Sequence, residues 1–252
     1  LHPIIYELPV ASAQIKSCLL LASLYTDPKD GNSEIMEPAP CRDHTERMLR
    51  GFGYEVGTEG ARISISGGGT LKACHIDVPA DISSAAFFMV GASICEGSDI
   101  LLRHVGINPT RTGVITILQA MGADITLENV REVGGEPVAD IRVKYAPLKG
   151  IKIPVNQVPL AIDEFPALFI AAACAQGTTV LSEAEELRVK ESDRIQVMAD
   201  GLAELGVKHS VREDGIVIEG GEIGGGEVNS HGDHRIAMAF SVAALKASSP
   251  IR

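Results

Sequence analysis

One pattern occurs four times along the chain, and this repetition limits the fold more than any other feature of the sequence. Each copy starts with a small polar cluster and continues as a long run rich in Ala and Leu. The leading polar residues, which lie 69, 82 and 70 positions apart, are Ser12, Asp81, Asp163 and Asp233. Small polar residues favour helix N-caps, and a helix that is apolar around most of its circumference belongs in a core. The sequence therefore predicts four buried helices.

A second, amphipathic helix follows the buried one in three of the copies. Apolar residues recur there at intervals of three and four, charged residues fill the other positions, and each run ends at Gly. These helices are predicted to begin at Asp43, Pro109 and Lys190. A β-branched run precedes each of them and two short alternating segments follow, which is typical of strands. The predicted unit is strand, buried helix, strand, amphipathic helix and two strands.

The number of units predicts how the chain is divided. One unit precedes residue 78, two follow it, and a fourth stops after its first helix. Because every unit has a helix to bury, we expect an α/β fold in which a bundle of helices is surrounded by sheets. Pro79 lies between the first unit and the rest, so we place a hinge there, with one domain over 1–78 and another over 79–252.

The net charge of the chain limits the kinds of molecule that it is expected to bind. Acidic residues outnumber basic ones by 33 to 22, for a net charge of −11. Such a field disfavours nucleic acid and anionic membranes, which bind basic surfaces, but a few clustered Arg and Lys residues can still hold a small anion. No apolar run reaches the roughly 18 residues that a membrane span needs. The sequence also starts without Met, so we expect a piece of a longer protein.

Metal, nucleotide and disulfide motifs do not occur. The five cysteines include no C-x-x-C pair, and most lie in Ala-rich runs, which favours buried, inert thiols in a reducing cytoplasm. The seven histidines lack metal-ligand spacing, and the Gly-rich segments at 67–70 and 224–226 lack the Lys of a phosphate loop. We expect no metal site and no cofactor.

Charged residues open two of the apolar or amphipathic helices. Lys190 and Arg194 are four positions apart, which places them on one face of a helix that also carries Glu191. Cations oppose the dipole at a helix N-terminus, so their presence there favours an anionic ligand, and Arg235 at the start of an apolar helix favours the same. The alternatives are a solvated face with local ion pairs and, for Asp163, a simple N-cap.

The first repeat offers a weaker candidate. Ser12, Ala13 and Gln14 supply small and amide groups at a helix start, which suit a phosphate or a hydroxyl. Taken alone, such residues are more often only a cap.

Seven segments combine these residues in a fixed order: SAQIKSCLLLA at 12–22, RDHTERML at 42–49, DISSAAFF at 81–88, NPTRTG at 108–113, DEFPAL at 163–168, LRVKESDRI at 187–195 and DHRIAMA at 233–239. Together they closely resemble the 5-enolpyruvylshikimate-3-phosphate synthase family, also called 3-phosphoshikimate 1-carboxyvinyltransferases. The pairing of KESDRI with DHRIAMA is the most specific part. UDP-N-acetylglucosamine enolpyruvyl transferases share the repeat architecture without these two motifs and are the alternative family.

The resemblance implies two lobes, each an inside-out α/β barrel of three βαβαββ units with buried helices and outward sheets. Residues 1–78 then form the last unit of the first lobe, and residues 79–252 form most of the second lobe. A front portion and a short C-terminal tail are expected to be missing, and the full-length protein is expected to be a monomer. With part of the site absent, the fragment alone is expected to be inactive. The alternative of a different class is a phosphometabolite-binding module without chemistry.

The implied reaction moves the enolpyruvyl group of phosphoenolpyruvate onto the 5-hydroxyl of shikimate 3-phosphate and releases phosphate. It proceeds by addition and elimination through a tetrahedral ketal phosphate. The addition needs a base on the hydroxyl and an acid at the methylene carbon, which two carboxylates in different environments can supply. By motif position, Asp163 resembles the base and Glu191 the acid.

The resemblance also implies the residues that bind each substrate. Those for shikimate 3-phosphate are Ser12, Ala13, Gln14, Arg42, Asp163 and Lys190. Those for phosphoenolpyruvate are Gln14, Arg194 and Arg235, and the two Arg side chains suit a bidentate clamp. Some family members have Ser in place of Ala13, so a side-chain hydroxyl contact is lost here while a backbone N–H remains. The implied location is the cytoplasm, with no nucleic acid, membrane, metal or cofactor involved.

Overall fold

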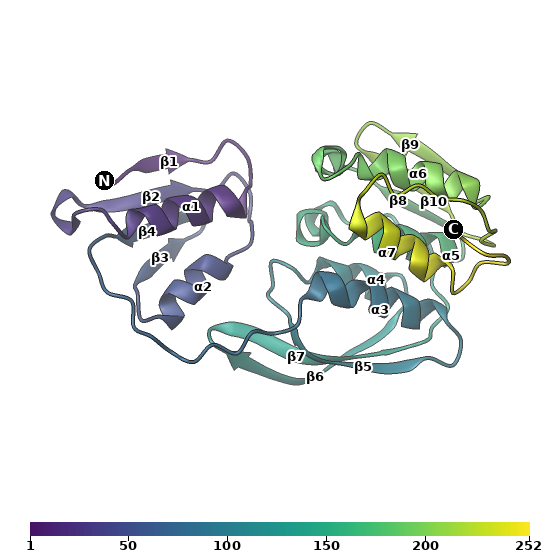
Figure 1. The fold of residues 1–252 in the computed structure, drawn as a ribbon, viewed down its shortest axis with the longest axis horizontal. Coiled ribbons are helices and arrows are strands. Elements are labelled where there is room, and N and C mark those ends of the chain that lie inside the picture. The colour runs from purple at the N-terminus through teal and green to yellow at the C-terminus, as the bar shows by residue number, and fades with distance from the viewer. The chain divides into compact units, whose positions relative to one another are not determined.

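The computed structural model describes residues 1–252, and the chain divides into two compact units (Figure 1). The first unit comprises Leu1–Val78 with Arg131–Val138, and the second comprises Pro79–Val130 with Ala139–Arg252. The buried side chains form two separate apolar clusters. No helix in the chain is both long enough and apolar enough to cross a membrane.

The first unit contains one copy of the predicted repeat. Its elements are β1 (Ile5–Glu7), α1 (Ala13–Ser23), the 3₁₀ helix η1 (Pro28–Asp30), β2 (Asn32–Met36), α2 (His44–Gly51), β3 (Val56–Glu59) and β4 (Arg62–Ser66). The strands form one sheet in the order β1-β2-β4-β3, in which only the β1–β2 pair is parallel. The βαβαββ order is the one that the sequence predicts.

The predicted burial of α1 is wrong. Only Lys16, Leu20 and Ser23 of this helix are buried, whereas Leu21 is 48% exposed. The reason is that α1 packs with one face against β2 and β4, and no second helix layer in this unit covers its other face. Cys18 and Cys74 are exposed as well, and the other three thiols are only partly buried, which contradicts the expectation of buried cysteines.

The second unit contains the remaining repeats. Its helices are α3 (Ile82–Ile94), α4 (Gly113–Ala120), η2 (Val155–Gln157), η3 (Pro159–Ala161), α5 (Phe165–Cys174), η4 (Glu185–Val189), α6 (Arg194–Glu204) and α7 (His234–Ala243). Its strands are β5 (Asp99–Gly106), β8 (Thr178–Leu181), β9 (His209–Arg212) and β10 (Gly215–Glu219), together with β6 (Asp124–Val133) and β7 (Glu136–Lys144), whose adjoining ends belong to the first unit. They form two sheets, β5-β7-β6 and β8-β10-β9.

The helices α3, α5 and α7 pack against one another at the centre of the second unit, with the sheets outside them (Figure 1). Nearly every side chain of α3 and α5 is buried, and α7 buries one face. Phe165 and Phe169 stack with ring centroids 5.9 Å apart. Each such side chain contributes about 1.5–3 kcal/mol of hydrophobic stabilisation. The inside-out α/β arrangement that the resemblance implies is therefore present.

The repeats bring equivalent helix ends into equivalent positions. Short parallel bridges, Ala80–Val105, Lys152–Val180 and Gly226–Ile251, take the place of the first strand in each later repeat. Asp81 caps α3 by accepting from the backbone N–H of Ser84 at 3.1 Å, and Asp233 caps α7 in the same way. The starts of α3, α5 and α7 can therefore present polar groups together.

The amphipathic helix of the third repeat begins later than predicted. It starts at Arg194, because Asp193 accepts from the backbone N–H of Gln196 at 3.0 Å and acts as the N-cap. Lys190 and Glu191 precede the helix, so the argument that Lys190 and Arg194 share a helix face is wrong. Their proximity comes instead from a common neighbour, Asp163.

Candidate functional site

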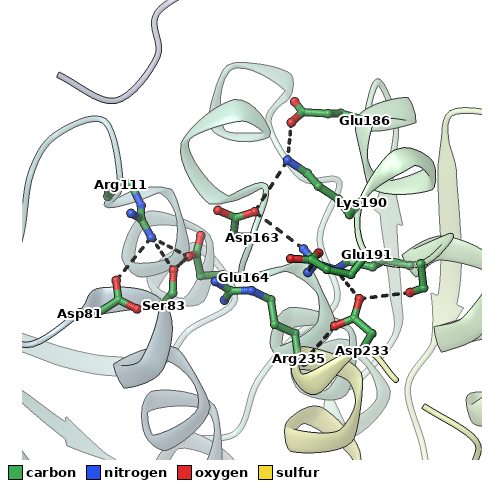
Figure 2. A network of polar contacts seen from close by, with 12 residues as sticks. Asp81, Ser83, Arg111, Asp163, Glu164, Glu186, Lys190, Glu191, Asp233 and Arg235 are labelled. Atoms are coloured by element: carbon green, nitrogen blue, oxygen red, sulfur yellow. Dashed lines mark hydrogen bonds and ion pairs between the residues drawn. The ribbon is translucent and has the colours of Figure 1, made fainter. Parts of the chain in front are cut away.

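The candidate site lies in the second unit, where α5, α6 and α7 begin (Figure 2). Asp163 is in the turn before α5, and its side chain is 17% exposed. Its Oδ1 atom lies 3.8 Å from Lys190 Nζ and 3.7 Å from Arg194 Nη1. A carboxylate in this position can accept a proton from a nearby hydroxyl.

Arg194 is the most buried cation of the site. Its side chain is 1% exposed, Nε donates to Asp233 Oδ2 at 2.9 Å, and Nη2 pairs with Glu191. The Nη1 atom is buried and makes no hydrogen bond. Leaving a buried charged donor unsatisfied is costly, so an oxyanion that reached Nη1 beside Asp163 would gain a strong, charge-assisted contact.

Asp233 forms a buried ion pair with Arg194. Burial by itself would raise the pKa of Asp233, but the hydrogen bond and charge of Arg194, the backbone N–H of Arg235 and the hydroxyl of Ser192 together bring the pKa below its ordinary value. The Arg235 N–H donates at 2.9 Å and the Ser192 hydroxyl at 3.1 Å. Asp233 is therefore a fixed negative charge, and Arg194 is held in one orientation.

The two residues before α6 are more accessible. Lys190 is 21% exposed and pairs with Glu186 as well as with Asp163. Glu191 is 55% exposed while it pairs with the buried Arg194. Asp163 is thus enclosed by two cations, whereas Glu191 reaches solvent.

Arg235 is the second residue of α7 and is partly buried. Figure 2 shows its guanidinium pointing toward Glu164, and the charge of Arg235 acts to lower the pKa of that carboxyl. The structure thus groups five of the predicted residues around the helix starts: Asp163, Lys190, Glu191, Arg194 and Arg235.

The other four predicted residues belong to the first unit. Ser12 is the N-cap of α1, and its Oγ accepts from the backbone N–H of Ile15 at 3.3 Å. Ala13 is partly buried, Gln14 is exposed in the first turn, and Arg42 is partly buried just before α2. Ser12 therefore acts as an N-cap, and the side chain of Gln14 faces solvent.

Sequence reasoning gave no role to a second polar cluster at the starts of α3 and α5. Glu164 is 1% exposed and accepts a hydrogen bond from Ser83, which in turn accepts one from Arg111. Arg111 Nη2 also lies 3.4 Å from Glu164 and 3.5 Å from Asp81. Burial raises the pKa of Glu164, against the hydrogen bond from Ser83 and the charge of Arg111. The sequence feature that points to this cluster is Glu164, a second carboxyl group directly before a helix of apolar residues.

The site combines three cations with the carboxyl groups of Asp163 and Glu191 near the starts of α5, α6 and α7. Lys190, Arg194 and Arg235 can hold anionic groups, assisted by the helix dipoles. Asp163 and Glu191 can accept and donate protons beside them. Such an arrangement suits the binding of anionic groups beside carboxyl groups that can transfer protons.

The comparisons with known proteins agree on one family. A sequence model of "EPSP synthase (3-phosphoshikimate 1-carboxyvinyltransferase)" matches residues 1–252. A 3-phosphoshikimate 1-carboxyvinyltransferase of Methylococcus capsulatus is 68% identical over 98% of the chain. One of Alkalilimnicola ehrlichii is 68% identical over the whole chain.

Solved structures are similar as well. Two structures of EPSP synthase from Acinetobacter baumannii match the whole chain with TM-scores of 0.94 and 0.92, at 63% and 61% sequence identity. The chain covers 58% and 57% of those proteins. It likewise spans 56% of the two curated relatives, little more than half of their length.

Proposed function

The chain belongs to the EPSP synthase family, and on this premise we propose that the protein to which it contributes is a 3-phosphoshikimate 1-carboxyvinyltransferase. The observation that carries the proposal is the position of Asp163, 3.8 Å from Lys190 Nζ and 3.7 Å from Arg194 Nη1. A base held by two cations, one of which has an unsatisfied buried donor, suits a hydroxyl substrate beside an anionic one.

Each substrate has its own set of groups in this proposal. Arg194 and Arg235 bind the carboxylate and phosphate of phosphoenolpyruvate, since guanidinium groups match both geometrically, and Gln14 assists them. Lys190 and Asp163 bind the hydroxyl side of shikimate 3-phosphate. Ser12, the backbone N–H of Ala13, Gln14 and Arg42 bind the rest of that molecule, including its phosphate.

The proposed chemistry has two steps. In the addition, Asp163 takes the proton of the 5-hydroxyl, the oxygen bonds to C2 of phosphoenolpyruvate, and Glu191 protonates the methylene carbon to a methyl group. In the elimination, the methyl group gives a proton back to Glu191 and the enol ether forms. The bond from C2 to the phosphate oxygen breaks, and the departing phosphate takes the proton held by Asp163, so both carboxyl groups end as they began. Lys190 and Arg194 stabilise the negative charge that develops near them.

The 252-residue chain should fold but show no useful turnover by itself. The second unit has its own helical core, which supports folding, whereas the relatives are nearly twice as long. Removing donors from a preorganised electrostatic site costs about 100- to 1,000-fold in rate per donor. Arg194 and Arg235 should still attract anions, so weak phosphate or phosphoenolpyruvate binding without turnover is expected. We further propose that the full-length protein is a cytoplasmic monomer.

The test is a phosphate-release assay with shikimate 3-phosphate and phosphoenolpyruvate. The full-length protein should release phosphate and form the enol ether, and Asp163→Asn should lower kcat by at least about 100-fold. The 252-residue chain should be inactive alone and gain activity when the missing front segment is added. Absence of phosphate release by the full-length protein would contradict the proposed activity. Robust turnover by the 252-residue chain alone would contradict the expectation that part of the active site lies outside this chain.

A further inference from the structure

We infer that Glu164, Ser83 and Arg111 form a positioning cluster. The cluster limits the movement of Asp163, which directly precedes Glu164, and it places a carboxyl group opposite Arg235. The inference rests on the proposed function, because it concerns how the base and one phosphoenolpyruvate-binding residue are held. The motif comparison assigns no role to any of the three residues.

The Glu164 side chain is bonded to a helix other than its own. Glu164 directly follows Asp163 and precedes α5, yet its side chain makes no capping bond to its own helix. It accepts instead from the Ser83 hydroxyl in the first turn of α3, 81 positions earlier in the chain. Consecutive Cα atoms are about 3.8 Å apart, so anchoring Glu164 to another helix leaves Asp163 little freedom to move.

The hydrogen bonds among Ser83, Glu164 and Arg111 connect all three side chains to one another. The Ser83 hydroxyl has one proton, which it donates to Glu164, and its oxygen accepts from Arg111 Nη2. Arg111 lies 3.4 Å from the Glu164 carboxylate, and its side chain is 14% exposed. The cluster therefore fixes three segments to one another: the start of α3, the loop before α4 and the turn before α5.

The Glu164 carboxyl group lies close to the charge of Arg111 and is affected by that of Arg235. Glu164 is 1% exposed, and a buried carboxylate needs a compensating cation. Arg111 supplies that cation from one side, and the Arg235 guanidinium points toward Glu164 from the other (Figure 2). An acidic group fixed at this place gives Arg235 a preferred direction before substrate binds, which lowers the cost of arranging it in the complex.

The experiment uses the full-length protein with four variants and one control. Glu164→Gln and Ser83→Ala each remove one part of the cluster, Arg111→Met removes the cation, and the double variant R111M/E164Q removes both charges. Glu219→Gln is the matched control, because Glu219 is an exposed Glu at the end of β10. The assay measures kcat, KM for both substrates and the melting temperature.

If the cluster has a positioning role, kcat and the melting temperature of the variants should change independently of each other. E164Q and S83A should lower kcat about tenfold or more, because small misplacements of a catalytic group cost that much, while KM for both substrates changes less than kcat. R111M should lower both kcat and the melting temperature, since it leaves Glu164 buried without its cation. The double variant should recover the melting temperature and keep the low kcat.

Three results would overturn the inference. One is a kcat of E164Q equal to that of E219Q. Another is recovery of kcat together with stability in the double variant, which would show a merely structural role. The third is absence of phosphate release by the wild-type protein and E219Q, which would reject the proposed function itself and the positioning role with it.

Discussion

Arg194 and Asp233 form a buried ion pair, in which Nε donates to Oδ2 at 2.9 Å and both side chains are at most 1% exposed. The two residues open neighbouring helices, α6 and α7, from different repeats of the chain. The pair leaves Arg194 Nη1 directed to the side of Asp163, 3.7 Å away. The orientation of Arg194 Nη1, the predicted anion-binding donor, thus depends on Asp233, for which no contact with substrate is predicted.

We expect Asp233→Asn to destabilise the second unit strongly. The change keeps the size of the side chain but leaves Arg194 without its buried counter-charge, which typically costs about 3–5 kcal/mol in the free energy of unfolding. Urea unfolding of the 252-residue chain, followed by circular dichroism, measures this. Asp200→Asn is the control, because Asp200 is exposed on α6 and only accepts from the Gln196 side chain at 2.7 Å. A control loss as large as that of D233N would contradict the prediction.

The first unit has its own buried ion pairs. Lys16 is fully buried in α1, and its Nζ lies 2.7 Å from Glu37 and 2.6 Å from Glu46. We expect Lys16→Met to lower the free energy of unfolding by about 3–5 kcal/mol, because two carboxylates lose their cation. Adding Glu46→Gln to K16M should recover part of the loss. The exposed Lys29 provides the control K29M, which should unfold like the wild type.

Lys16 also gives a prediction for alkaline pH. Burial acts to lower the pKa of Lys16, but the bonds to Glu37 and Glu46 outweigh it and raise the pKa above its ordinary value of 10.5. A raised pKa in the folded state means that the stabilisation is complete below that ordinary value and is lost as pH rises through the folded pKa. The first unit of K16M should therefore lack the steep loss of stability above pH 10.5. An equal loss in K16M and wild type would contradict this.

Glu164 should give a pH dependence of the same sign as that of Lys16, but at lower pH. Burial raises its pKa above the ordinary 4.5, so the folded state binds its proton more tightly than the unfolded state. The unfolded state then carries fewer protons between the two pKa values, and the free energy of unfolding falls as pH rises through that range. Glu164→Gln should flatten this fall relative to wild type. Unfolding of both proteins at pH 5 and pH 8 tests it, and parallel changes in both would contradict it.

The thiols should differ in reactivity. The pKa of Cys174 is about 12 because of burial, and that of Cys41 is about 12 because of burial and its hydrogen bond to Glu37. Since the thiolate is the nucleophile, both should resist iodoacetamide at pH 8, whereas the exposed Cys18 and Cys74 should react first. Timed alkylation with peptide mass spectrometry measures the order. Early labelling of Cys41 would show that its contact with Glu37 is not maintained.

The repeated unit and three of its helix N-caps could be predicted from the amino-acid sequence. Ser12, Asp81 and Asp233 cap α1, α3 and α7 through bonds that span at most three residues, so local sequence was enough to predict them. The inside-out fold follows as well, because each repeat carries an apolar helix that must be covered. The motifs also selected the charged residues that meet before α5 and α6.

The pairing of those charges and the burial of each helix depend on how the chain folds as a whole. Asp233 and Arg194 are 39 positions apart, and Ser83 and Glu164 are 81 apart, so no local pattern reports either contact. The same holds for α1, whose apolar sequence resembles that of α5 although the sheet covers only one of its faces. Helix capping is a short-range interaction, whereas burial and ion pairing depend on which segments of the folded chain become neighbours.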